Sequence, residues 1–124
     1  MSLFDWLVLG HLMGDFLFQT DNMAQKKSQE WPWLLKHAGL YMVAITIIII
    51  AYALSHPIPP WLAIAAWLFI FSTHLILDRR SLTARWMQLV GMSPEQPWLV
   101  IVVDQIFHLL TLGVVAQTLA LVGQ

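Results

Sequence analysis

The sequence predicts an all-α polytopic membrane protein, an antiparallel bundle of four transmembrane helices with a short interfacial helix between the third and the fourth. Apolar residues make up 59% of the 124 residues and charged residues only 10%, against about 25% charged residues in a typical soluble domain. Four long apolar segments follow one another, and the basic residues are confined to the stretches near two of their junctions. There is no internal repeat, so we expect a single four-helix transmembrane domain over residues 1–124.

The first apolar segment, residues 3–18, predicts a retained transmembrane helix rather than a signal peptide. It has no basic n-region and no small-x-small cleavage site, and it carries ionisable residues in its body. Because it is shorter than the roughly 20 residues that cross a hydrocarbon core, this helix would stand nearly upright. The polar residues 21–32 predict a loop or a short helical turn before the second helix, residues 33–54.

The rest of the chain supplies two further spans and their connection. Three prolines within residues 55–60 predict a tight external turn before the third helix, residues 60–77. In residues 79–92, apolar side chains recur every three or four positions among arginines, which predicts a helix lying on the inner leaflet. A solvated connector is the alternative. Residues 98–122 predict the fourth transmembrane helix.

The distribution of basic residues predicts the orientation in the membrane. Lysines occur around the junction of the first two helices and arginines between the third and fourth, whereas the turn at residues 55–59 and both termini have neither. The positive-inside rule assigns the basic end to the cytoplasm. We therefore expect a multi-pass protein of the bacterial inner membrane with both termini external.

Pairs of histidine and aspartate lie four positions apart within the apolar segments. They are His11 with Asp15, His74 with Asp78, and Asp104 with His108. Four residues make about one helical turn, so both side chains of a pair project from one helix face. Ionisable groups at membrane depth are costly and usually face the interior of a bundle. The pairs therefore indicate one shared site.

Counting residues from the cytoplasmic helix ends places groups from all four helices at one depth. Asp15, His37, His74 and Asp104 each come within about seven residues of these ends, which is at most about 10 Å at a rise of about 1.5 Å per residue. Asp78 would lie shallower, and the two remaining histidines of the pairs about one turn deeper. Four antiparallel helices would bring all of these groups around one axis.

Nitrogen and oxygen ligands of this kind suit a divalent transition metal, with Zn favoured and Mn or Fe as alternatives. The predicted metal ligands are His11, Asp15, His37, His74, Asp78, Asp104 and His108. The chain has no cysteine, which excludes thiolate ligands. Seven groups exceed the need of one tetrahedral ion, so either two ions share them or some groups orient the ligands. A hydrogen-bonded network between helices, without metal, is the simpler alternative, and a proton relay is another.

The sequence also suggests roles for other residues near these groups. Gln105 is expected to belong to a polar network, and Tyr41 either donates a hydrogen bond to the site or is an interfacial or packing residue. Gly10 and Gly14 form a small-xxx-small step that predicts close helix packing. Lys27 is expected near the cytoplasmic mouth, where it could attract an anionic substrate, although the positive-inside bias explains it without a function.

Short motifs around these residues resemble the signature of a family of small bacterial integral-membrane proteins described only as a domain of unknown function. They are His11-Leu-Met-Gly-Asp15-Phe-Leu-Phe-Gln19, Met23-Ala-Gln-Lys-Lys27-Ser28, His37-Ala-Gly-Leu-Tyr41, His74-Leu-Ile-Leu-Asp78 and Asp104-Gln105-Ile-Phe-His108. The resemblance covers most of the chain and implies no particular activity. A looser similarity, in size, helix number and intramembrane His and Asp content, is to bacterial inner-membrane proteins labelled metal-dependent hydrolases, and it is an analogy.

The site favours a membrane-embedded metal-dependent hydrolase that acts on a lipid or isoprenoid phosphate or ester. A bound ion would activate water, and Asp78, as the shallowest aspartate, is the candidate general base. The alternatives are a metal-ion or proton transporter and a non-catalytic metal-binding membrane subunit. Expected partners are the lipid bilayer, a lipid-like substrate and a second copy of the chain. The net charge of −1 gives no indication of a nucleic-acid partner.

Overall fold

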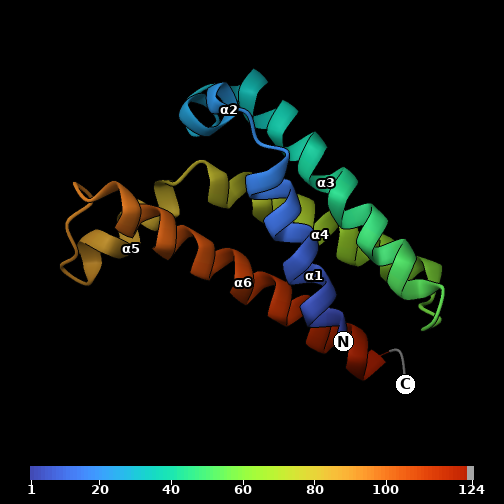
Figure 1. Ribbon diagram of the computed structural model, residues 1–124. Coiled ribbons are helices and arrows are strands. Elements are labelled where there is room, and N and C mark those ends of the chain that lie inside the picture. Colours follow the sequence, from blue (N-terminus) through green and yellow to red (C-terminus); the bar gives the residue numbers. More distant parts are fainter. Residues whose placement is uncertain (123–124) are drawn as a thin grey trace.

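The computed structural model describes residues 1–122, which are helical outside their connections and contain no strand (Figure 1). The elements are α1 (Leu3–Leu12), the π-helical turn η1 (Met13–Leu17), α2 (Asp21–Lys26), α3 (Trp31–Ala53), α4 (Pro60–Asp78), α5 (Ser81–Leu89) and α6 (Pro97–Val122). The predicted all-α class is confirmed. Of the alternatives for the two connections, the helical ones are present, as α2 before the second span and α5 after the third.

Three of these helices, α3, α4 and α6, are long and apolar enough to cross a membrane. Their outward faces carry large apolar side chains such as Ile47, Leu68 and Leu110, each more than half exposed. Apolar surface on this scale is the pattern of a membrane protein, in which lipid covers it. The predicted first span, residues 3–18, corresponds to α1 and η1, which together cover residues 3–17 and are not among these three helices.

Local sequence signals explain where several helices begin. Ser2 caps α1 by accepting a hydrogen bond from the Asp5 N–H, while the Asp5 carboxylate accepts one from the Ser2 N–H. Thr20 caps α2 by accepting a hydrogen bond from the Met23 N–H. Proline occupies one of the first two positions of α3 and of α4, where its missing N–H has no helical partner to lose.

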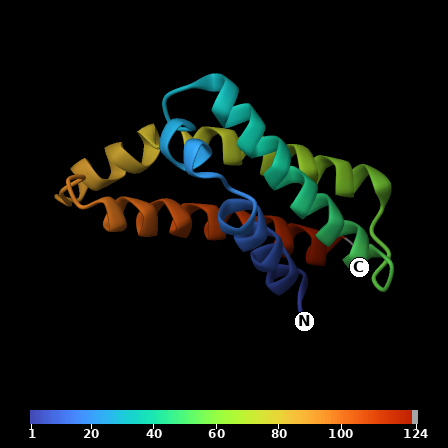
Figure 2. The same ribbon diagram turned by 45° about the horizontal axis from the view of Figure 1, so that its top comes forward.

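The α1–η1 segment and the three long helices pack in a ring (Figures 1 and 2). The α1–η1 segment contacts α3 and α6, and α4 contacts the same two helices. The short helix α2 lies on α3, and α5 lies against α4 and α6. Figure 2 shows α2 and α5 toward one end of the molecule, with the N-terminus and the α3–α4 turn at the other. The basic residues therefore gather at the α2–α5 end.

Two glycines bring the first helical segment close to α3. A Cβ on Gly14 would lie 2.6 Å from Cδ2 and 3.0 Å from Cα of Tyr41. A Cβ on Gly10 would lie 2.8 Å from Cγ1 of Ile48. Since neither position has room for a larger residue, the predicted small-xxx-small step does serve close packing. This approach brings η1 directly against the face of α3 that carries Tyr41.

The interior divides into an apolar half and a polar half. The apolar half lies toward the N-terminus and the α3–α4 turn, and it contains Leu7, Ile45, Ile70 and Leu112, each at most 2% exposed. The polar half lies toward α2 and α5. Its buried polar or charged side chains, among the described residues, are His11, Asp15, Lys27, His37, His74, Asp78, Thr83, Asp104 and His108.

Candidate metal centre

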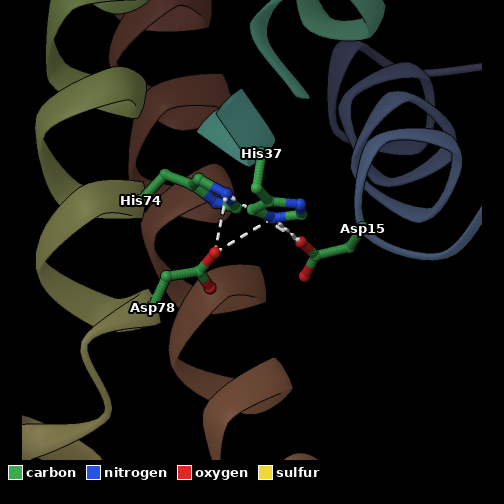
Figure 3. A group of neighbouring side chains, drawn as sticks. All are labelled: Asp15, His37, His74 and Asp78. Atoms are coloured by element: carbon green, nitrogen blue, oxygen red, sulfur yellow. Dashed lines mark hydrogen bonds and ion pairs between the residues drawn. The ribbon is translucent and has the colours of Figure 1, made fainter. Parts of the chain in front are cut away.

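Asp15, His37, His74 and Asp78 form a compact group in the polar half, with side chains that point toward one another from η1, α3 and α4 (Figure 3). His37 Nε2 lies 2.9 Å from Asp15 Oδ1 and 3.0 Å from Asp78 Oδ2. His74 Nε2 lies 3.2 Å from the same Asp78 oxygen. Each residue offers one ligand atom, and these atoms all lie within 4.8 Å of one another. This first group could hold a metal ion.

Asp78 also belongs to a second group, with Asp104 and His108 of α6. His108 Nδ1 lies 2.9 Å from the backbone carbonyl oxygen of Asp104. Because a carbonyl oxygen only accepts, Nδ1 must carry the hydrogen, and in a neutral ring Nε2 then has a free lone pair. That Nε2 faces Asp78 Oδ1 at 3.4 Å. When the ring is neutral, two buried acceptors face each other, and either a proton on Nε2 or a bound cation would relieve their repulsion.

The spacing of the ligands follows from the local helix geometry. His74 and Asp78 lie one turn apart on α4, as Asp104 and His108 do on α6. Asp15 lies instead on the π-helical turn, where the Phe18 N–H donates to the Met13 carbonyl at 3.0 Å across five residues. The predicted continuous α-helix over residues 3–18 is therefore wrong at its end. Such single π turns are frequent at functional sites.

Lys27 lies deeper than its expected place at the cytoplasmic mouth, because only 4% of it is exposed. Its Nζ lies 3.0 Å from Asp78 Oδ2, 3.5 Å from Asp15 Oδ1 and 3.1 Å from His37 Nε2. The ammonium group thus lies beside both carboxylates of the first group. The sequence contains no local signal for this position, because Lys27 directly follows α2 and the packing of α2 on α3 sets its place.

Thr83, Gln105 and Tyr41 surround the two groups. Thr83 of α5 is fully buried and donates a hydrogen bond to Asp104 Oδ1 at 3.2 Å, a contact that the sequence reasoning missed. Gln105 Nε2 donates to Asp15 Oδ2 at 2.9 Å, so its expected place in a polar network is confirmed. Tyr41 combines both roles considered for it, since its ring stacks on that of His74 at 3.6 Å between centroids and its hydroxyl reaches His11.

His11 lies outside both groups, whereas the other six predicted ligands fall within them. Its Nε2 lies 2.7 Å from Gln105 Oε1, and its Nδ1 lies 3.2 Å from the Tyr41 hydroxyl. The carboxylate of Asp15, its partner in the sequence pair, is farther from it, at 3.7 Å. Both ring nitrogens of His11 therefore have hydrogen-bonding partners.

The donor atoms at the two groups fit a cation because several of them have no partner of hydrogen-bonding geometry within the described residues. These buried atoms include Nε2 of His74, Nε2 of His108 and Oδ1 of Asp78, whereas Asp78 Oδ2 is paired with the Lys27 ammonium at 3.0 Å. Leaving buried polar atoms unpaired is costly. His37 Nε2 is close to both carboxylates and to an ammonium, although a neutral ring nitrogen can only donate or only accept.

The balance of charges in the polar half also suits a bound cation. Its three buried carboxylates, Asp15, Asp78 and Asp104, face one buried ammonium, Lys27, within the described part of the chain. With neutral histidines, two negative charges are left without a buried counter-charge, which either protonated histidines or a bound cation would supply. Buried charges in proteins are usually paired or bind metals, so a divalent cation matches both the donors and the charge.

A comparison with known families finds one match that extends over nearly the whole chain. The model of the family described as "Protein of unknown function (DUF3307)" matches residues 3–124. No curated protein and no solved structure matches the chain.

Proposed function

The chain belongs to the DUF3307 family of proteins of unknown function, and we propose that it is a metal-dependent hydrolase embedded in the membrane. Its substrate would be a lipid or isoprenoid phosphate or ester. The observation that carries the proposal is the buried group Asp15, His37, His74 and Asp78, whose ligand atoms lie within 4.8 Å of one another. Buried imidazole and carboxylate groups in this number are expensive in an apolar protein unless they serve a common purpose.

One or two divalent transition-metal ions would be held by the two groups, with Zn favoured and Mn or Fe as alternatives. The proposed ligands are Asp15, His37, His74, Asp78, Asp104 and His108. Asp78 would serve both ions, since one of its oxygens faces His37 and His74 and the other faces His108. A carboxylate that bridges two ions is common in hydrolytic metal sites. The sequence suggests a different role for Asp78, that of a free general base. The nitrogen atoms close to both of its carboxylate oxygens favour the role of a metal ligand over that of a base.

A metal ion at this site would polarise a phosphoryl or acyl oxygen and lower the pKa of a bound water. The chain itself would supply charge and orientation. The Lys27 ammonium, which lies among the carboxylates, is suited to hold an anionic oxygen of the substrate once a cation has taken over the carboxylates. Thr83 would fix the orientation of the Asp104 carboxylate through the hydrogen bond between them.

The proposed setting is the bacterial inner membrane, with the whole chain as a single domain of four spans. α1 and η1 would form the fourth span beside α3, α4 and α6. The α2–α5 end, which carries the basic residues, would face the cytoplasm, and both termini would be external. The candidate metal centre lies in the half of the interior nearest this end, where the headgroup-proximal bond of a lipid would be within reach.

A non-catalytic metal-binding membrane subunit is the second candidate. It is favoured by the burial of the site, since none of the six proposed ligands is more than 3% exposed. A hydrolase would have to open this site to its substrate, whereas a structural or regulatory metal site need not open. Transport is less well supported, because the apolar half of the interior lies between the site and the opposite end.

Metal analysis of the purified full-length protein tests the proposal. We expect one or two transition-metal ions per chain in the wild type and fewer in His74→Ala. His56→Ala is the matched control, because His56 is an exposed histidine in the α3–α4 turn. A wild-type protein that binds no transition metal above background, even when metal is supplied during gentle purification, would remove the basis of the proposal.

Activity separates the candidates once metal binding is established. Proteoliposomes containing the metal-loaded protein would be incubated with a library of lipid phosphates and esters, and in parallel with metal ions on one side. Hydrolysis that is lost in His74→Ala and kept in His56→Ala supports the enzyme. Ion flux without hydrolysis supports transport. The absence of both activities supports the binding subunit.

A further inference from the structure

The amide of Gln105 has a fixed orientation because it lies between a carboxylate and an imidazole. Its Nε2 donates to Asp15 Oδ2 at 2.9 Å. The opposite orientation would direct the amide oxygen at a carboxylate oxygen, and two acceptors repel each other. Gln105 Oε1 therefore faces His11 Nε2 at 2.7 Å as an acceptor.

The orientation of Gln105 determines the tautomer of His11. Because Oε1 of Gln105 can only accept, His11 Nε2 must carry a hydrogen and donate it. In a neutral ring the other nitrogen, Nδ1, then has a lone pair, and its partner at 3.2 Å is the Tyr41 hydroxyl, which can donate. All three side chains are thus aligned with their donors pointing in one direction.

We infer that Tyr41, His11 and Gln105 form a one-directional hydrogen-bond chain that ends on Asp15 Oδ2, and that His11 is a positioning residue for Asp15 rather than a metal ligand. The other oxygen of Asp15, Oδ1, faces His37 at 2.9 Å within the first group. The hydrogen-bond chain would therefore hold one carboxylate oxygen so that the other stays directed at the ion. Such outer hydrogen bonds are known to orient metal ligands.

Tyr41 couples this chain to a second proposed ligand. Its ring stacks on the imidazole of His74 with 3.6 Å between centroids and 9° between planes. His11 itself stacks against His108 with 5.1 Å between centroids. The same side chains that orient Asp15 therefore also limit the rotation of two imidazoles. The positioning role rests on the proposed metal site, whereas the hydrogen-bond chain itself does not.

The hydrogen-bond chain is tested first in the metal-free protein. Nitrogen-15 NMR of the histidine rings in detergent-solubilised full-length protein distinguishes the two tautomers and the charged form. We expect His11 to carry its hydrogen on Nε2, with Nδ1 as an acceptor, and Gln105→Leu to remove this preference. A His11 ring with its hydrogen on Nδ1, or on both nitrogens, would overturn the inference.

The positioning role is tested by counting imidazole ligands with X-ray absorption spectroscopy on the Zn-loaded protein. His11→Phe should leave the metal stoichiometry and the number of bound imidazoles unchanged while it weakens metal binding about 10- to 100-fold. His74→Phe should remove one imidazole, and His56→Phe should change nothing. Loss of an imidazole in His11→Phe would identify His11 as a ligand and overturn the inference.

If His11→Phe does not fold, the smaller change Tyr41→Phe still tests the inference. Tyr41→Phe keeps the ring on His74 and removes only the hydroxyl, so we expect a shifted His11 Nδ1 resonance and weaker metal binding at unchanged stoichiometry. An unchanged resonance would contradict the inference. If the wild type binds no metal but His11 has the expected tautomer, the proposed function fails while the hydrogen-bond chain stands.

Discussion

At the scale of single residues, Asp78 is the point on which most of the polar half converges. One carboxylate oxygen lies within 3.2 Å of nitrogen atoms of His37, His74 and Lys27. The other faces His108. Because Asp78 belongs to both candidate groups, its loss should affect the binding of every ion. The loss of a residue that belongs to one group should affect only the ion in that group.

Replacing Asp78 by asparagine should therefore abolish metal binding, while Asp104→Asn should remove at most one ion. Asparagine keeps the shape of the side chain but lacks the negative charge that a divalent cation requires. Elemental analysis of the purified variants measures both stoichiometries. Asp21→Asn, at an exposed aspartate of α2, is the control. Wild-type metal content in Asp78→Asn would show that the carboxylate is not a shared ligand.

Lys27→Met should strengthen metal binding. The ammonium group lies within 3.5 Å of atoms of both carboxylates in the first group, so removing its charge leaves a site that attracts a cation more strongly. We expect about a tenfold lower dissociation constant, which corresponds to about 1.4 kcal/mol, measured by competition with a calibrated chelator.

The matched control for this prediction is Lys36→Met, because Lys36 is exposed and lies over Trp33. If Lys27 also holds an anionic substrate oxygen, the KM for a lipid phosphate should rise in Lys27→Met and not in Lys36→Met. Weaker metal binding in Lys27→Met would mean that the ammonium supports the site rather than competing with the ion.

The sequence predicts individual residues of the candidate site where helical periodicity or depth in the membrane connects them. The pairs His74 with Asp78 and Asp104 with His108 follow from the helical repeat, and His37 follows from its depth. Lys27 and Thr83 reach the site through the packing of the short helices α2 and α5 on the longer ones. No spacing rule connects residues on separate elements, so these two were not predicted as members of the site.

At the scale of elements, the α1–η1 segment determines where Asp15 lies. Asp15 lies on the π turn, and Gly14 allows this turn to lie directly on Tyr41 of α3. The beginnings of several helices are readable from Ser2, Thr20 and the prolines. The π turn is not, because it results from packing and leaves no characteristic residue pattern.

Gly14→Ala should destabilise the protein and weaken metal binding together. The added Cβ would lie 2.6 Å from the Tyr41 ring and 3.0 Å from its Cα, so η1 must move away from α3 and take Asp15 with it. Overpacking of this kind costs about 1 to 3 kcal/mol. The unfolding midpoint in detergent and the metal dissociation constant are the two measurements.

Gly39 provides the matched control within α3, since a Cβ there would meet no atom within 4 Å. Gly39→Ala should be neutral or stabilising by up to about 1 kcal/mol, because alanine favours the helix more than glycine does. Equal behaviour of the two variants would contradict a special role for the contact at Gly14.

At the scale of the whole molecule, the basic residues and the candidate metal centre share one end, and the apolar half of the interior occupies the other. The sequence predicts this asymmetry because the charges and the His/Asp pairs can be counted from the same helix ends. Among the described residues, α3, α4 and α6 have the length and hydropathy of membrane-crossing helices, and the α1–η1 segment is as short as the sequence indicates. A short helix can complete the ring without matching the length of its neighbours.

Thiol labelling in intact cells tests the proposed orientation, and the absence of native cysteine makes every introduced one unique. Ser55→Cys, in the exposed α3–α4 turn, should react with a membrane-impermeant reagent from outside. Glu95→Cys, in the exposed α5–α6 connection, should react only after lysis. The reverse pattern would place the candidate metal centre toward the external side.

The position of Lys27 has a consequence for how long an ion would stay. The ligands and Lys27 are buried, Lys27 directly follows α2, and the opposite half of the interior is filled by apolar side chains. An ion bound there would leave through a local opening at the α2–α5 end, such as the lifting of α2 from α3 or of α5 from α6. Residence time would then be set by the motion of the short helices at this end. The metal that occupies the protein would reflect which ion was available during membrane insertion more than which binds most tightly at equilibrium.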